Sequence, residues 1–308
     1  MYFPYLRGRQ YELLALRELA TGELLGKSVI PVIEPIKLTS TFDGTLKGFQ
    51  AKNLPFALIS NPTVGELTHT TDLAGELLSR FDGNSAFIPS VLLNKNAESI
   101  LATLSKKGFS TNGILTIFNN RDFIDVYKRL FNATAPKYTL FPDERQIRRT
   151  VGANKVLFED KFNKQDRNAD YPEDEFYSED HLFFQEEGYV GFGDYSIVGD
   201  EYTESGFAPY AVAIHIVYFA DDDTLRIRHF ISDSNDDISD VAGKYYEAVS
   251  KLAKWYNAGQ QRQLTTALSA LLTHAETGYY PGLPTVKKLS IMHHLELLGK
   301  FLDGGMIK

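Results

Sequence analysis

The chain has 308 residues, of which 43% are hydrophobic and 23% charged, a composition typical of a globular protein with one large core or two modest ones. It contains no cysteine, which excludes disulfides, thiolate metal sites and a cysteine nucleophile. Because this fits a reducing compartment, we expect a cytoplasmic protein. The formal net charge of -8 argues against capture of nucleic acid by the whole surface and leaves only a local basic patch open. No apolar run approaches the ~20 residues of a membrane-spanning helix, so we expect no membrane anchor and no signal peptide.

Short apolar, β-branched or aromatic runs recur along the chain, and each is typical of a buried strand. The nine runs are residues 2–6, 29–36, 56–60, 86–93, 114–118, 138–141, 155–158, 189–192 and 211–219. The first five begin about 27 residues apart, which is the length of a strand–helix–strand unit. Such units lay down parallel strands with right-handed crossovers.

Helical patterns separate the early runs. They cover residues 9–25, 72–81, 97–107 and 121–131, with glycines just past three of them. Eight strand–helix units close a (β/α)8 barrel, so one of the nine strands is surplus, either the first or the last. The alternative, an open doubly wound sheet, would carry a glycine-rich turn after the first strand, but only Gly8 lies there. We therefore predict an α/β fold with a TIM-like (β/α)8 barrel in residues 1–235.

The last third of the chain changes its pattern. Residues 211–219 and 225–231 flank an acidic turn and predict a β-hairpin. Helical periodicity then covers residues 240–257, with Asp240 as N-cap, and continues over 264–274 and 286–302. Since no Pro/Ser/Gly linker precedes it, we expect the helical segment 236–308 to pack on the barrel.

Residues 159–204 form an acidic insertion. They hold 15 Asp and Glu against three Lys and Arg, a net charge of -12, which leaves +4 for the rest of the chain. The segment is also rich in aromatic residues, which disordered acidic tails lack, so we expect it to fold.

The sequence contains no Walker loop, G-x-S-x-G, H-E-x-x-H or EF-hand motif, and we interpret residues 191–194 as a structural turn. In a barrel the chemistry lies at the carboxyl ends of the strands. The polar residues that follow strand-like runs are Glu34, Asn61, Asn94, Asn119, Asp143, Glu159, Asp160 and Asp194.

Three of these carboxylates are the candidate metal site. Glu159, Asp160 and Asp194 offer the oxygen ligands that Mg²⁺ or Mn²⁺ prefers, and Glu159, Asp194 and His215 are the candidate catalytic residues, with His215 as general acid–base. Strand-end caps and solvated loop charges explain each carboxylate more simply, and a hydrogen-bonded core histidine is the more common explanation of a residue such as His215.

Other histidines and lysines carry weaker signals. His229 alternates with an arginine, so one of the two faces solvent. His293 and His294 point about 100° apart on a helix, which favours packing over joint ligation. The pair Lys287 and Lys288 can meet phosphates, although a solvated helix face explains it more simply.

Five segments of the sequence carry a resemblance to a known family: MYFPYLRGRQYELLALREL, GFGDYSIVG, AIHIVY, IRHFISDSND and PGLPTVKKLSIMHHLELL. Over most of its length the chain resembles an uncharacterised family of bacterial and phage proteins grouped with the phage beta protein. The resemblance implies a gene in a mobile or defence-like region, often beside a small nuclease-like protein. It brings no assigned catalytic residues.

Two functions remain open from the sequence. The first is a metal-assisted hydrolase of the phosphoester class, in which the metal lowers the pKa of a bound water and His215 moves protons. The second is a non-catalytic barrel whose acidic, aromatic segment docks a basic protein such as the nuclease-like neighbour.

Overall fold

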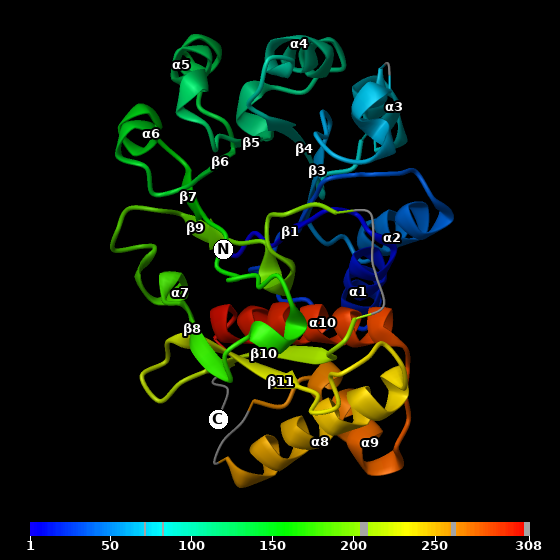
Figure 1. The fold of residues 1–308 in the computed structure, drawn as a ribbon. Helices are drawn as coiled ribbons and strands as arrows, with labels where there is room; N and C mark the ends of the chain where they lie inside the picture. The colour runs from blue at the N-terminus through cyan, green and yellow to red at the C-terminus, as the bar shows by residue number, and fades with distance from the viewer. Residues whose placement is uncertain (71, 82, 204–208, 260–262, 305–308) are drawn as a thin grey trace.

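The computed structural model describes residues 1–70, 72–81, 83–203, 209–259 and 263–304. Eight parallel strands surround one core, each paired with the next around the ring (Figure 1). In order they are β1 (Tyr5–Leu6), β2 (Val32–Ile33), β3 (Phe56–Ile59), β4 (Phe87–Leu92), β5 (Leu115–Ile117), β6 (Tyr138–Phe141), β7 (Lys155–Phe158) and β9 (Gly191–Gly193). The ring closes where the N–H groups of Phe3 and Tyr5 donate to the carbonyls of Phe192 and Asp194, both at 2.8 Å.

This closure confirms the predicted (β/α)8 barrel. The surplus candidate strand is the last one, residues 211–219, which lies outside the ring. The run 191–194, which we expected to be a turn, begins with the barrel strand β9, because its backbone pairs with β7 on one side and with the N-terminal segment on the other.

Helices cover the outside of the barrel. They are α1 (Gln10–Thr21), α2 (Ser40–Ala51), α3 (Leu73–Arg80), α4 (Ala97–Lys106), α5 (Ile124–Phe131), α6 (Arg145–Thr150) and α7 (Asp180–Phe183), with 3-10 turns η1 (Glu66–His69), η2 (Thr111–Gly113), η3 (Arg121–Phe123), η4 (Asn168–Asp170) and η5 (Ser196–Val198). The sequence prediction lacks α2, whose two glycines weaken the helical pattern. The structure forms it from a Thr39 cap that accepts the Phe42 N–H and from the buried Phe42, Leu46 and Phe49.

The core has two layers. Phe3, Val32, Ile59, Ile117 and Val156 belong to the group of buried side chains that fills the barrel interior. The alternate residues of the same strands face outward into a larger apolar layer beneath the helices. This alternation follows from the period of two along each strand.

A second sheet packs beside the barrel. It holds the antiparallel strands β10 (Ala213–Phe219), β11 (Leu225–Ile231) and β8 (Asp174–Ser178), so the predicted hairpin is present and the acidic insertion contributes the third strand. The helix α8 (Val241–Ala258) packs on its far side, and α9 (Thr266–Thr277) packs against α8 and α10. The long helix α10 (Leu283–Leu302) lies between this sheet and the barrel, where it contacts α1, η5 and β10.

Asp240 caps α8 as predicted, with its side chain accepting the N–H of Gly243. None of the helices in the described residues is both long and apolar enough to cross a bilayer.

Two glycines make the barrel closure possible. Gly191 and Gly193 pair with Val156 and Phe158, so they share the interior-facing side of the wall. A Cβ atom on Gly191 would lie 2.6 Å from the carbonyl oxygen of Met1, and one on Gly193 would collide with the carbonyl oxygen of Phe3. Backbone atoms held in a sheet cannot move aside cheaply, so the N-terminal segment reaches β9 only because these side chains are missing.

We predict that Gly193→Ala lowers the free energy of unfolding by about 1–3 kcal/mol, the usual cost of an overpacked interior. Urea unfolding of the purified chain measures this. Gly152→Ala is the matched control, because no atom lies within 4 Å of its added Cβ. Equal midpoints for the two variants would contradict the argument.

Candidate functional site

The acidic residues after β7 and β9 lie at one end of the barrel, because these strands are parallel neighbours. Their side chains nevertheless have separate partners. Glu159 forms an ion pair with Lys161, Oε2 to Nζ 2.8 Å. Asp160 accepts the N–H groups of Phe162 and Asp200 at 3.0 and 2.8 Å, so it holds the ends of two loops.

Asp194 lies in a buried network outside the barrel wall. Its Oδ1 accepts the hydroxyl of Tyr2 at 2.7 Å and the N–H of Ser196 at 2.8 Å, and its Oδ2 accepts the hydroxyl of Tyr177 at 3.1 Å. His294 on α10 completes the group, with Nδ1 3.0 Å from the Ser196 hydroxyl and Nε2 3.9 Å from Oδ2 of Asp194. Every one of these residues is at most 4% exposed, so the network joins the barrel, the second sheet and α10.

The expected metal site is not assembled. Among the residues that the structure describes, no group of three or more His, Asp or Glu side chains is arranged to hold a metal ion. Glu159 and Asp160 are consecutive in extended chain and engage different partners. Asp194 is enclosed by hydroxyl and N–H donors, so it has no free face to offer.

Two of the other residues at the carboxyl ends of the strands stabilise the barrel mouth. Glu34 is buried and accepts the Tyr5 hydroxyl at 2.7 Å and the Thr63 N–H at 2.6 Å. Asn61 exchanges two hydrogen bonds with the backbone of Leu92, both at 2.8 Å. These side chains replace strand pairing where the barrel opens.

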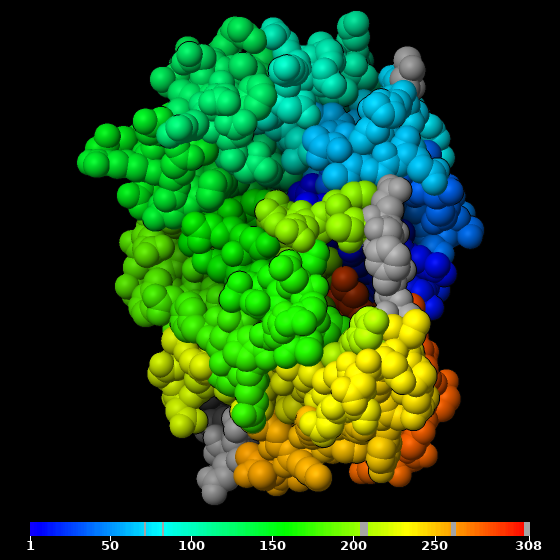
Figure 2. Space-filling view, in the orientation of Figure 1, coloured from blue at the N-terminus to red at the C-terminus, as the bar shows by residue number. Residues whose placement is uncertain are grey.

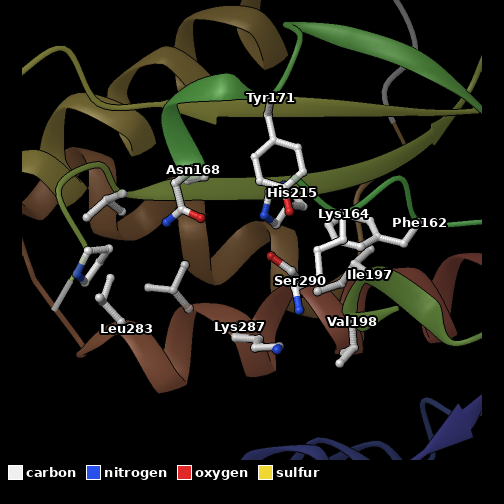
Figure 3. A pocket seen from close by; sticks show the side chains of 14 residues that line it. Phe162, Lys164, Asn168, Tyr171, Ile197, Val198, His215, Leu283, Lys287 and Ser290 are labelled. Carbon is white, nitrogen blue, oxygen red and sulfur yellow. The ribbon is translucent and has the colours of Figure 1, made fainter. Parts of the chain in front are cut away.

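His215 lies in the wall of a cavity between β10, α10 and the loops that follow β7 and β9 (Figure 3). The cavity volume is about 240 Å³. The described lining residues are Phe162, Lys164, Asn168, Tyr171, Ile197, Val198, Pro209, Val212, Ala213, His215, Leu283, Val286, Lys287 and Ser290. This described lining contains no carboxylate, and its mostly apolar wall with few polar groups is typical of a small-molecule site.

The space-filling view shows dark red atoms of α10 at the bottom of a hollow in the surface (Figure 2). In the close-up, Ser290 points from α10 towards His215 and Tyr171 on the opposite wall (Figure 3). Ser290 is only 2% exposed, and its hydroxyl has no hydrogen-bond partner among the described residues.

A chain of hydrogen bonds ends at His215. Nδ1 of His215 lies 2.7 Å from Nδ1 of His229, and Nε2 of His229 lies 3.1 Å from Oε1 of Glu175 on β8. The Tyr171 ring covers both imidazoles, with ring centroids 4.7 Å from each. The predicted burial of His215 is partial, since its side chain faces the cavity.

The partners fix the protons along this chain. A carboxylate only accepts, so His229 carries its proton on Nε2 and presents a lone pair at Nδ1. His215 must then donate from Nδ1, which leaves the lone pair of its Nε2 without a hydrogen-bond partner among the described residues. Burial lowers the pKa of His215 well below its ordinary value, and His229 and Lys287 act in the same direction. The imidazole is therefore neutral at pH 7 and able to accept a proton.

The sequence predicted only a weak functional role for His229. It predicted no part in the site for Glu175, Tyr171 and Ser290. A signal for His229 was available, because a hairpin that pairs Phe219 with Leu225 also places His215 opposite His229. Nothing in the sequence pairs β11 with β8, so Glu175 could not be found in this way.

His293 and His294 both serve packing. His293 bridges the Thr265 hydroxyl and the Val217 carbonyl at 2.8 and 2.7 Å, whereas His294 belongs to the Asp194 network. Burial lowers the pKa of His293 to about 4 and that of His294 to about 3.

We predict that stability falls as the pH drops from 7 to 5. The folded state keeps His294 neutral, but the unfolded chain binds a proton at this imidazole near pH 6.5, so its contribution is lost as the pH falls towards about 3. The slope approaches about 1.4 kcal/mol per pH unit for one such histidine. His293 acts in the same direction. Asp194 opposes both, because burial raises its pKa and protonation at low pH stabilises the folded state.

Urea unfolding at pH 7 and pH 5 tests this assignment. His294→Gln should show a smaller loss between the two pH values than wild type, whereas His69→Gln, at an exposed position, should keep the wild-type loss. An unchanged pH dependence in His294→Gln would contradict it.

The comparisons with known proteins do not identify a relative. No protein-family model matches the chain, and no curated protein or solved structure shows significant similarity to it. The function of the chain is therefore inferred from the geometry of the cavity.

Proposed function

We propose that this protein is a hydrolase of a small ester or phosphoester, with His215 as its general acid–base residue. The observation that carries the proposal is the hydrogen-bonded chain Glu175–His229–His215, which ends in a cavity beside Lys287. A base oriented by a second residue, which is oriented in turn by a carboxylate, is a recurring arrangement for proton abstraction.

The chemistry needs one water molecule. His215 Nε2 takes a proton from this water while the water oxygen bonds to the phosphorus or carbonyl carbon of the ester. The bond to the leaving oxygen then breaks, and the proton on Nε2 passes to that oxygen, so the histidine returns to its neutral form. No other reactant is required.

His229 and Glu175 stabilise the positive charge that forms when His215 takes a proton from the water. Protonated His215 would stand close to the Lys287 ammonium, which disfavours a second positive charge. His215 can hand its Nδ1 proton to His229, and the positive charge then lies beside Glu175. Burial lowers the pKa of His229 below its ordinary value, and the Glu175 carboxylate opposes this effect.

This route replaces the metal-assisted mechanism that the sequence suggested, because the carboxylates expected to bind metal lie outside the described lining of the cavity. A cytoplasmic location and a mobile-element or defence setting stay part of the proposal. The support for them is the lack of cysteine and the resemblance described above.

We predict that His215→Gln lowers kcat/KM by about 10²–10⁴, the usual contribution of a general acid–base residue. A panel of p-nitrophenyl phosphates and carboxylic esters provides the assay. His69→Gln is the control and should keep full activity, since this exposed residue does not line the cavity. Hydrolysis that survives in His215→Gln would refute the assignment.

The pH profile gives a second readout. Wild-type kcat/KM should stay level at neutral pH and fall only well below pH 6.5, because His215 accepts protons only under more acidic conditions. Glu175→Gln removes the charge that favours a protonated histidine pair, so its acidic limb should move to lower pH while the maximal rate decreases. A residue with only a structural role would leave the position of this limb unchanged.

One observation favours docking to a protein as a second candidate function. Most aromatic residues of the acidic insertion are buried, but Phe176 and Phe183 are 53% and 42% exposed. Phe176 lies on β8, which pairs with β11 on one side only within the described sheet. An edge strand with an exposed aromatic residue, within the acidic insertion, fits an extended basic segment of the nuclease-like protein that the resemblance implies.

For this candidate we predict that Phe176→Ala weakens binding to the purified nuclease-like protein by about tenfold, as for an aromatic anchor. Tyr279→Ala is the control, because Tyr279 is 60% exposed on the segment between α9 and α10. The affinity should also decrease between 50 and 300 mM salt, roughly as screening of opposite charges requires. Equal binding by both variants would reject this docking surface.

A further inference from the structure

Two adjacent lysines on α10 have different surroundings. Nζ of Lys288 lies 2.6 and 2.8 Å from the two carboxylate oxygens of Glu18, so the Glu18 carboxylate offsets the charge of this lysine. Lys287 lines the cavity, keeps contact with solvent, and has no hydrogen-bond or ion-pair partner among the described residues.

We propose that Lys287 and Ser290 form a subsite for the phosphoryl group of a small phosphate ester. The subsite belongs to the cavity of the proposed function and names its substrate class, but binding there does not require turnover.

Among the residues that the structure describes, the charges around Lys287 leave one cation without an offsetting carboxylate. Arg9 and Lys164 lie close enough to Lys287 to affect its ionisation, and so does Glu12. Arg9 stands 3.7 Å from Glu12, and Lys164 stands 2.7 Å from Glu201. These two carboxylates offset two of the three cations. Within the described part of the chain, the uncompensated charge belongs to Lys287, and an anion beside it would relieve the repulsion.

Ser290 provides an independent sign of a ligand. Its side chain is 2% exposed, lines the cavity and has no hydrogen-bond partner among the described residues, so its hydroxyl can donate to a group inside the cavity. Ser290 follows Lys287 by three positions, so both lie on one face of α10. A ligand oxygen between them would accept from the ammonium and from the hydroxyl.

The group that fits best is tetrahedral and anionic. A phosphoryl group offers three oxygens, for Lys287, Ser290 and the remaining donor protons of Lys164, which stays paired with Glu201, whereas a carboxylate offers two. The apolar walls, including Phe162, Ile197 and Val286, suit a small organic group on the ester oxygen. His215 then faces the ester from the opposite wall.

Calorimetric titration with phenylphosphonate, which cannot be hydrolysed, tests the subsite directly. We expect Lys287→Met to raise its Kd about tenfold or more, the usual effect of losing a hydrogen bond to a charged group. Lys287→Arg should retain most of the binding. Lys288→Met is the matched control, one residue away, and should stay within about twofold of wild type.

Several results would overturn the inference. Benzoate binding as tightly as phenylphosphonate would reject the phosphate class. Equal weakening in Lys287→Met and Lys288→Met would mean diffuse attraction and no subsite. Wild type that fails to bind phenylphosphonate, even if it hydrolyses other esters, would reject the subsite alone.

The proposed hydrolase function can be tested separately from the subsite. His215→Gln should still bind phenylphosphonate within about threefold of wild type, because the subsite lies on α10. Intact binding in a wild-type protein that hydrolyses neither phosphate esters nor carboxylic esters would therefore reject the function and keep the subsite.

Discussion

The buried carboxylate of Asp194 is the interaction on which the rest of the structure depends. A carboxylate removed from water needs a donor for each lone pair that faces the protein, and here the donors come from segments far apart in the chain. Tyr2 belongs to the N-terminal segment that closes the barrel, Tyr177 to β8 and Ser196 to η5, while His294 brings in α10. Satisfying one charge thus fixes the barrel, the second sheet and the C-terminal helix relative to one another.

The position of α10 follows from this network and defines the cavity. Lys287, Ser290 and His294 are spaced by three and four residues, so they lie along one face of the helix. His294 reaches the Asp194 network, and the other two residues of this face line the cavity opposite His215. The helix that anchors the two layers therefore also supplies the cavity with an ammonium and a hydroxyl.

The cavity holds polar groups that are expensive to bury. Burial disfavours a charge on His215, and Ser290 on the opposite wall is 2% exposed. A purely structural interface would be more stable with apolar side chains at these positions. Perturbed ionisable groups that converge on one hollow, with a hydrogen-bonded chain behind them, are the arrangement that acid–base chemistry requires.

The sequence by itself determined the strand–helix units, because apolar runs about 27 residues apart are typical of such units, and the missing glycine-rich turn after the first strand favoured the barrel over an open sheet. It also determined the hairpin and the capped helix α8, whose signals are local. It could not determine the site. Glu159, Asp160 and Asp194 share one end of the barrel as expected, yet their side chains have separate partners, because each direction depends on contacts with distant loops. The pairing of β11 with β8, which joins Glu175 to the two histidines, and the seating of α10 beside them are contacts between distant segments, and only the tertiary structure decides such contacts.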